Sequence, residues 1–437
     1  MLQWLTRRHL CKQISPQPNA ESLSASCNSQ ERARGIQMES NVYDVTDWKT
    51  PGKPIDPQDD IGAVINSIIA DIKQRQTNPA DKPGAVIYIP PGTYSLKTRV
   101  VVDVSFLTIR GSGHGFSSLS IRYNSNTAGW HEINPGGSHI RVENTDGNSE
   151  AFIVSRSGNP RLSSVAFENF CLDGVSFGSN QNSYRNGKVG IRFATDNDSA
   201  RVRGMGMVYL EQALLIQGPD ALDVSGNFIA ECGTCVMIIG GSQASKISDN
   251  HLGAGPVGFT IFAENSNGLL ITGNNIFPRG IDSVHIKNSY RSNISSNRLQ
   301  SFYPGSITLE GNCKENLISS NMFERQVETY GPFIGVGNGL DDDFGVVQVN
   351  GDGNTITSNH VTLIIPPDQV KPANGTAAIF RIKNGDQNLV GANHIISNLA
   401  VHTVVLDAGT TNSHVFDSGT AAQLLANSSS YGFRPTP

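Results

Sequence analysis

An asparagine returns seven times at the same place in a short pattern, three residues after a Val or Ile and two before an apolar residue. These asparagines are Asn227, Asn250, Asn274, Asn297, Asn321, Asn359 and Asn393. The steps between them are 23, 24, 23, 24, 38 and 34 residues. Repeats of this length are typical of solenoids, in which each repeat packs only against its neighbours. We therefore expect one coil per repeat, regular over about residues 222–323, with longer insertions after residue 323.

The contents of each repeat indicate strands. Short runs of β-branched and apolar residues, such as 236–239, 269–271 and 284–286, are separated by Gly, Asn and Ser. No helical period of useful length and no leucine-rich pattern appears in them. These features predict an all-β fold, a parallel β-helix. The repeated Asn is expected to adopt a left-handed backbone conformation at a corner and to bond its side-chain amide to the next coil.

A single amphipathic helix is predicted over residues 57–76. Its apolar residues, Ile61, Val64, Ile65, Ile68 and Ile72, share one helical face. Asp56 before Pro57 supplies an N-cap and a proline in the first turn. Such a helix would cover the first coil, whose core and sheet edge would otherwise be open. We expect a disordered leader over residues 1–40, followed by one β-helix domain over residues 41–437.

Composition excludes several classes of partner. Only 16% of the residues are charged, the net charge is -5 and no long basic run occurs, which argues against nucleic acid. No stretch approaches about 18 apolar residues, so no membrane span is predicted. No apolar segment typical of a signal peptide follows Arg7 and Arg8, and localisation stays open between extracellular and cytoplasmic. Cys232 and Cys235 lack a second pair at zinc-finger spacing, and we interpret them as structural.

Acidic residues within the Gly-, Asn- and Ser-rich repeats are the best candidates for chemistry. They are Glu168, Asp173, Asp220, Asp223, Glu231, Glu264, Asp282 and Glu310. Cleavage of a glycosidic bond requires two carboxyl groups. Asp220 and Glu231 lie 11 residues apart, about half a coil, so their spacing alone does not bring them together. A bend or a neighbouring subunit would be needed.

Side chains that could stack on sugars or bind them are also present. They are Trp130, Tyr209, Phe277, Arg279, Phe302 and Tyr303, and we add Glu264 as a polar contact. Each of these residues is more often structural than functional, so they form a secondary list of substrate-binding candidates.

Several blocks of the sequence resemble inulin fructotransferases, a family of glycoside hydrolase family 91. The blocks are residues 86–99, 107–121, 227–235, 274–280, 301–305 and 337–342, and the resemblance returns at 416–420 and 433–437. It extends from about residue 41 to about residue 360 in long segments. The family's catalytic Asp and Glu match Asp220 and Glu231. The segment around Glu231 matches closely, whereas the neighbours of Asp220 differ.

The resemblance implies a right-handed parallel β-helix like that of pectate lyases, assembled as a homotrimer with active sites near subunit interfaces. It also implies an enzyme that splits the terminal difructose unit from a β-2,1-fructan and closes it into a difructose dianhydride. Glu231 would act as the acid and Asp220 as the base. No metal or organic cofactor is expected.

Two other functions stay open. Close relatives hydrolyse the dianhydride, and this chain lacks the Trp-containing segment that we expect of the bacterial enzymes near residues 324–333. The sequence therefore leaves the reaction direction and the preferred dianhydride open. A non-catalytic β-helix that binds glycans is the third reading, although such a protein would not need the pair Asp220 and Glu231.

Overall fold

The computed structural model describes residues 41–52, 54–75, 84–116, 136–144, 150–158, 161–175, 184–255, 257–277, 280–301, 305–325, 345–364, 378–398, 402–418, 424–425 and 431–433. All of them belong to one compact unit, Asn41–Pro437. The leader predicted over residues 1–40 lies outside the described residues.

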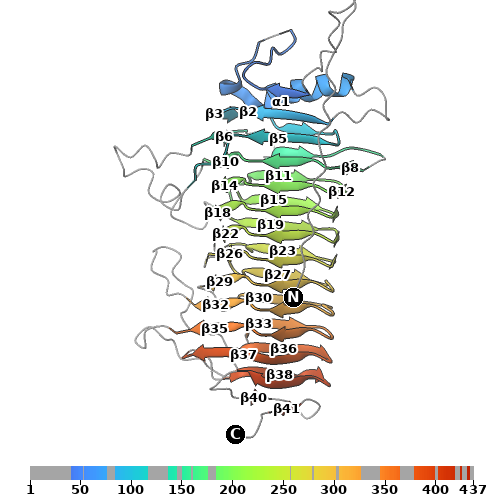
Figure 1. Ribbon diagram of the computed structural model, residues 1–437, viewed down its shortest axis with the longest axis vertical. Helices are drawn as coiled ribbons and strands as arrows, with labels where there is room; N and C mark the ends of the chain where they lie inside the picture. The colour runs from blue at the N-terminus through green and yellow to red at the C-terminus, as the bar shows by residue number, and fades with distance from the viewer. Residues whose placement is uncertain are drawn as a thin grey trace, which may run out of the picture. The chain divides into compact units, whose positions relative to one another are not determined.

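Three parallel sheets run through this unit, and successive coils add one strand to each in turn (Figure 1). The first sheet contains β1 (Val42–Asp44), β2 (Ala85–Ile89), β5 (Leu107–Gly111), β9 (Ala166–Glu168), β13 (Arg201–Arg203), β17 (Asp223–Ser225), β21 (Lys246–Ser248), β25 (Leu270–Thr272), β28 (Asn293–Ser295), β31 (Leu317–Ser319), β34 (Thr355–Thr357), β37 (Leu389–Ser397), β39 (His414–Ser418) and β41 (Tyr431–Phe433). The second sheet contains β3 (Gly92–Leu96), β6 (Ser138–Val142), β10 (Cys171–Asp173), β14 (Gly206–Val208), β18 (Phe228–Cys232), β22 (His251–Ala254), β26 (Asn275–Ile276), β29 (Arg298–Ser301), β32 (Met322–Arg325), β35 (His360–Leu363) and the later part of β37, which it shares with the first sheet.

The third sheet contains β4 (Val100–Val102), β7 (Glu150–Val154), β11 (Val189–Phe193), β15 (Gln212–Gln217), β19 (Thr234–Ile239), β23 (Ile261–Glu264), β27 (Val284–Lys287), β30 (Ile307–Glu310), β33 (Gly345–Asn350), β36 (Ala378–Asp386), β38 (His402–Thr411) and β40 (Leu424–Leu425). A short sheet of two-residue strands lies between the third sheet and the first. It contains β8 (Leu162–Ser163), β12 (Asn197–Asp198), β16 (Pro219–Asp220), β20 (Ser242–Gln243) and β24 (Ser266–Asn267). All the pairings within these sheets are parallel, so the predicted parallel β-helix is confirmed.

The core is built from ladders of apolar side chains that point inward from equivalent positions of successive coils. In the second sheet, Ile229, Leu252, Ile276, Leu299 and Phe323 are register partners in turn, and all are fully buried. Because side chains alternate between the two faces of a strand, the neighbours of these residues point outward and are free to form surface sites.

The repeated asparagines form a buried ladder, as predicted. Asn274 donates from Nδ2 to Oδ1 of Asn297 across 2.9 Å, and its backbone N–H donates to the same oxygen across 3.0 Å. The predicted left-handed conformation at these asparagines is wrong. The residue before each Asn adopts it instead, for example Asp249 at φ 57° and Ser296 at φ 59°. This arrangement turns the chain one residue earlier and leaves the Asn side chain pointing inward.

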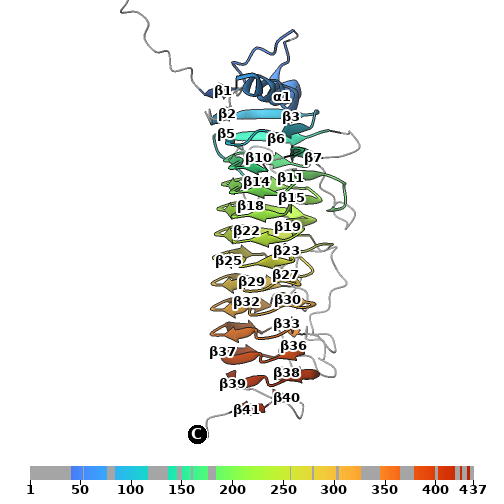
Figure 2. The same cartoon turned by 90° about the vertical axis from the view of Figure 1, so that its right-hand side faces the viewer.

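Helix α1 (Pro57–Arg75) packs against β3 and β4 of the first coil. Figures 1 and 2 both show it at this end of the β-helix, next to β2 and β3. The backbone N–H of Gln58 donates to the N-cap residue Asp56 across 2.9 Å. Asp60 interrupts the helix at φ -156°, and its carboxylate accepts N–H bonds from Lys97 and Thr98 at 3.1 Å each. The N-terminal helix predicted from the sequence is therefore tied to the coil that it covers.

Candidate functional site

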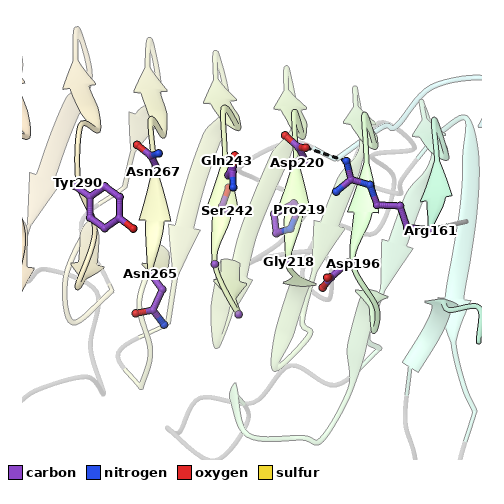
Figure 3. Close-up of a pocket in the computed structure, with 12 residues that line it drawn as sticks. Arg161, Asp196, Gly218, Pro219, Asp220, Ser242, Gln243, Asn265, Asn267 and Tyr290 are labelled. Atoms are coloured by element: carbon purple, nitrogen blue, oxygen red, sulfur yellow. Dashed lines mark hydrogen bonds and ion pairs between the residues drawn. The ribbon is translucent and has the colours of Figure 1, made fainter. Parts of the chain in front are cut away.

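Asp220 ends strand β16 at the corner between the third and first sheets. Its Oδ2 accepts a hydrogen bond from Arg161 across 2.9 Å, and the two side chains are 38% and 44% exposed (Figure 3). Asp198, the register partner of Asp220 on β12, lies 3.5 Å from the same guanidinium. The hydrogen bond to Asp220 raises the pKa of Arg161.

A polar pocket of about 260 Å³ opens beside Asp220 along the short sheet. Figure 3 shows its lining: Gln243 and Asn267 follow Asp220 on successive coils, and Tyr290 closes the row. Amides and a partly exposed phenol are groups that bind neutral sugars through hydrogen bonds and ring contacts. This pocket therefore suits a carbohydrate better than a strongly charged ligand.

Glu231 lies at the opposite corner of the coil, where β18 leaves the second sheet. It is 6% exposed and has a φ of 52°, which is rare for a residue other than glycine. The pairing of β18 with β22 shifts register at this residue, between Ala230 and Cys232. Tyr209, which holds the same position one coil earlier, has the same conformation at φ 59°, so the left-handed residue is a feature of this corner.

The carboxylate of Glu231 receives a hydrogen bond from a buried tyrosine. The hydroxyl of Tyr184 donates to Oε2 across 2.5 Å. Gly255 leaves room for the Tyr184 ring, since a Cβ at this glycine would lie 2.3 Å from Cδ1 of the ring. Gly233 similarly accommodates the backbone of Tyr184, whose carbonyl oxygen would lie 2.6 Å from an added Cβ. Two glycines next to Glu231 thus make the Tyr184 position possible.

Aromatic and histidine rings cover the second sheet beside Glu231. Phe228 lies 6.3 Å from His114 and 6.5 Å from Phe277, measured between ring centroids, and Phe277 stacks on His251 at 6.3 Å. Gly253 makes space for Phe277, because an added Cβ would lie 3.0 Å from its ring. Burial lowers the pKa of His114, which favours the neutral imidazole. Phe277 thus packs with Phe228 and His251 on the outer side of the second sheet.

The third sheet separates Asp220 from Glu231. Asp220 follows β15, and Glu231 precedes β19, the next strand of the same sheet; each of these strands has six residues. At about 3.3 Å per residue the width of the sheet is about 20 Å, whereas the two carboxyl groups of a glycosidase lie about 5–9.5 Å apart. Within one chain the structure does not bring the predicted pair together.

The other sequence candidates are dispersed. Glu264 ends β23 and accepts a 3.5 Å bond from Gly240, near the pocket residue Asn265. Asp173 bonds to His139, Asp223 pairs with Arg203, and Asp282 and Glu310 both bond to His285. Glu168 lies on β9 in the first sheet. Trp130, Arg279, Phe302 and Tyr303 lie outside the described residues.

Cys232 and Cys235 are free and fully buried. Burial raises the pKa of the Cys232 thiol to about 12, which leaves it protonated and unreactive, as expected of a structural cysteine. In the described part of the chain, no three His, Cys, Asp or Glu side chains gather into a metal site. No described helix has the length and apolarity needed to cross a membrane.

Comparison with known proteins identifies relatives along nearly the whole chain. The inulin fructotransferase (DFA-I-forming) of Arthrobacter globiformis is 49% identical over 404 residues, which cover 92% of this chain and 100% of that protein. Residues 320–437 match the family model described as the β-helix repeat of inulin fructotransferase. Residues 117–335 match a model described as the periplasmic copper-binding protein NosD.

Solved structures give the same result. The DFA-IIIase of Arthrobacter chlorophenolicus A6, without its lid and in complex with GF2, is 47% identical with a TM-score of 0.84, covering 91% of this chain and 100% of that one. The same enzyme in complex with DFA-III is 45% identical with a TM-score of 0.83, over 91% and 99% of the two chains. A tailspike protein of the E. coli bacteriophage HK620, at 12% identity and a TM-score of 0.55, shares the fold alone.

Proposed function

The chain belongs to the inulin fructotransferase family and is a fructan-cleaving enzyme; we propose that it splits the terminal difructose unit from inulin and closes it into a difructose dianhydride. The observation that carries this proposal is 49% identity along the entire length of a curated inulin fructotransferase. The polar pocket at Asp220 and the aromatic surface beside Glu231 suit a neutral sugar chain, which is consistent with this substrate.

The reaction is an intramolecular substitution. A hydroxyl of the terminal fructose attacks the anomeric carbon of the penultimate fructose, and the glycosidic oxygen that joins this carbon to the remaining chain leaves. One carboxylic acid protonates the leaving oxygen, and one carboxylate accepts the proton of the attacking hydroxyl. Because nucleophile and electrophile belong to one chain, the effective concentration of the hydroxyl is high, and cyclisation wins where the site excludes water.

The environments of the two carboxyl groups support Glu231 as the acid and Asp220 as the base. Glu231 is almost completely buried and bonded to the Tyr184 hydroxyl, which keeps water away from the proton that it transfers. Asp220 is partly exposed and paired with Arg161, an environment that suits a proton acceptor.

We propose that each active site is formed by two copies of the chain, Asp220 coming from one and Glu231 from the other. The separation of about 20 Å across the third sheet supports this arrangement, because one chain alone cannot place both groups at one bond. The outer face of that sheet carries a ladder of partly exposed apolar side chains, Leu215, Met237 and Phe262, that a second copy could cover. The homotrimer implied by the resemblance would supply such contacts in a closed ring.

Complementation between two inactive variants tests the shared site. Asp220→Asn and Glu231→Gln are each expected to lose about a hundredfold or more of kcat, the usual contribution of an acid or base. Co-expressed in equal amounts, they should regain about a quarter of the parental activity, because random assembly restores both carboxyl groups at one site in four. Asp220→Asn mixed with the double variant is the matched control and should stay inactive.

Each result has one meaning. If either single variant keeps activity within about tenfold of the parent, the catalytic pair is wrong. If both are inactive and the mixture remains inactive, the pair is retained and the shared site is wrong.

A second reading, hydrolysis of a difructose dianhydride, is favoured by one observation: the DFA-IIIase structures with bound DFA-III are 45% identical to this chain. Incubation with inulin and, separately, with DFA-I and DFA-III, followed by chromatography, distinguishes the readings. Inulin yielding a cyclic disaccharide supports the cyclising enzyme. A dianhydride yielding linear difructose, with inulin unchanged, supports the hydrolase. No change in any mixture leaves a glycan-binding protein.

A further inference from the structure

Two histidines face each other on the outer surface of the second sheet, far along the chain from the candidate catalytic residues. His360 on β35 and His394 on β37 are register partners on adjacent parallel strands. Their Nδ1 atoms lie 3.1 Å apart, and the ring centroids are 4.8 Å apart. Both side chains are exposed. Two ring nitrogens therefore point at one place that solvent ions can reach.

A hydrogen bond at Nε2 of His360 orients the ring so that Nδ1 faces His394. Its Nε2 lies 3.1 Å from the hydroxyl oxygen of Thr362, two residues along the same strand. When Nε2 carries the proton and donates it to Thr362, Nδ1 is left with a free lone pair directed toward His394. A second bond of this kind, which fixes the tautomer and orientation of an imidazole, is typical of histidines that bind metals.

We propose that Nδ1 of His360 and Nδ1 of His394 together bind a divalent late first-row transition metal ion, such as Ni²⁺, Zn²⁺ or Cu²⁺. Metal–nitrogen bonds of about 2.0–2.1 Å to two atoms 3.1 Å apart give an angle of about 100° at the metal, between square and tetrahedral geometry. Imidazole is a preferred ligand of these ions, and water would complete the coordination because the site is open.

Other histidines in the described part of the chain do not offer this arrangement. His285 already bonds through both ring nitrogens, to Asp282 and to Glu310. His251 has Asn275 as its ladder neighbour, and His414 has Leu389 and Tyr431. The pair is thus a specific product of the register between β35 and β37. A bound ion would link these two adjacent strands of the second sheet and stabilise the folded chain against unfolding.

Calorimetric titration with Ni²⁺ tests the site. The full chain, without a polyhistidine tag and freed of metal by a chelator, is compared with His360→Asn, His394→Asn and the control His414→Asn. We expect the parent and the control to bind one equivalent and to gain thermal stability. His360→Asn and His394→Asn should each bind Ni²⁺ at least about tenfold more weakly than the parent. Even changes to residues that only support metal ligands usually lower metal affinity by about that much.

Circular dichroism of the metal-free proteins shows that each variant is folded, and the exposure of both side chains makes unfolding unexpected. Equal Ni²⁺ affinity in the parent and in both His360→Asn and His394→Asn would overturn the proposal. So would the absence of saturable binding by the parent.

Discussion

The hydroxyl of Tyr184 donates a hydrogen bond to Oε2 of Glu231 across 2.5 Å, although the two residues are 47 positions apart and belong to different coils. Both side chains are buried, Tyr184 almost completely. A buried contact of this kind fixes which way the carboxyl group points, and Glu231 must point toward the leaving oxygen if it is the acid. Tyr184 is thus a positioning residue for the proposed reaction.

Replacing Tyr184 by Phe is expected to lower kcat by up to about tenfold, because a hydrogen bond between neutral groups contributes about 0.5–1.5 kcal/mol. KM should change little, because the hydroxyl contacts Glu231 rather than the substrate. Tyr94→Phe is the matched control, since its buried hydroxyl bonds to the carbonyl of Pro90 in the first coil. That variant should lose some thermal stability and keep its kcat. Equal kcat in Tyr184→Phe and the parent would contradict the positioning role.

Arg161 binds Asp220 through a partly exposed ion pair. Replacing Arg161 should therefore change the activity much more than the folding stability. Arg161→Gln is expected to reduce kcat/KM by about tenfold or more, while Tm stays nearly constant because exposed ion pairs contribute about 0–1 kcal/mol. Arg291→Gln is the control, because it breaks another exposed pair, with Glu315 at 2.7 Å, away from either carboxylate. Steady-state kinetics and thermal unfolding of both variants check the prediction.

The regular features of this fold are readable from the sequence because each residue type recurs once per coil. The Asn period predicted the buried ladder, and the spacing of Ile61, Ile65 and Ile68 predicted helix α1. The predicted position of the left-handed residue was wrong by one: Ser296, and not Asn297, adopts this conformation. The Asn side chain bonds both to the next coil and to a carbonyl of the preceding one, which requires it to point inward.

No repeat in the sequence predicts the residues that bond to Asp220 and Glu231. Arg161 is 59 residues from Asp220, and Tyr184 is 47 residues from Glu231. Arg161 and Tyr184 both precede the regular coils, so the repeat period does not relate their positions to Asp220 or Glu231. The width of the third sheet, which places Asp220 and Glu231 on opposite corners, also depends on strand lengths that the 11-residue spacing does not reveal.

Replacing an asparagine of the ladder by Ala should lower the free energy of unfolding most in the middle of the ladder. Oδ1 of Asn297 accepts from both the backbone N–H and the Nδ2 of Asn274, so Asn297→Ala leaves two buried donors unpaired. Each unsatisfied donor costs about 1–3 kcal/mol. Oδ1 of Asn227, at the first rung, accepts from the backbone N–H of Met205. Urea unfolding should therefore show a larger loss for Asn297→Ala than for Asn227→Ala, and the reverse order would contradict this account.

His285 links the stability of the third sheet to pH. Its Nδ1 bonds to Asp282 and its Nε2 to Glu310, each across 2.8 Å, and the rings of Phe259 and Phe262 pack beside it. Burial lowers the pKa of His285, but the hydrogen bonds to the two carboxylates outweigh it, so the pKa is raised above the ordinary value of 6.5. Lys287 also faces Glu310, and its hydrogen bond lowers the pKa of that carboxyl group.

A raised pKa in the folded state means that the folded chain binds the His285 proton more tightly than the unfolded chain does. This contribution to stability is complete below pH 6.5 and is lost as the pH rises through the higher pKa of the folded state. Thermal unfolding of the parent should therefore occur at a lower temperature at about pH 8.5 than at about pH 6, after correction with His285→Gln, which lacks the titrating group. If His285→Gln shows the same dependence on pH as the parent, the imidazolium bridge between Asp282 and Glu310 does not stabilise the sheet.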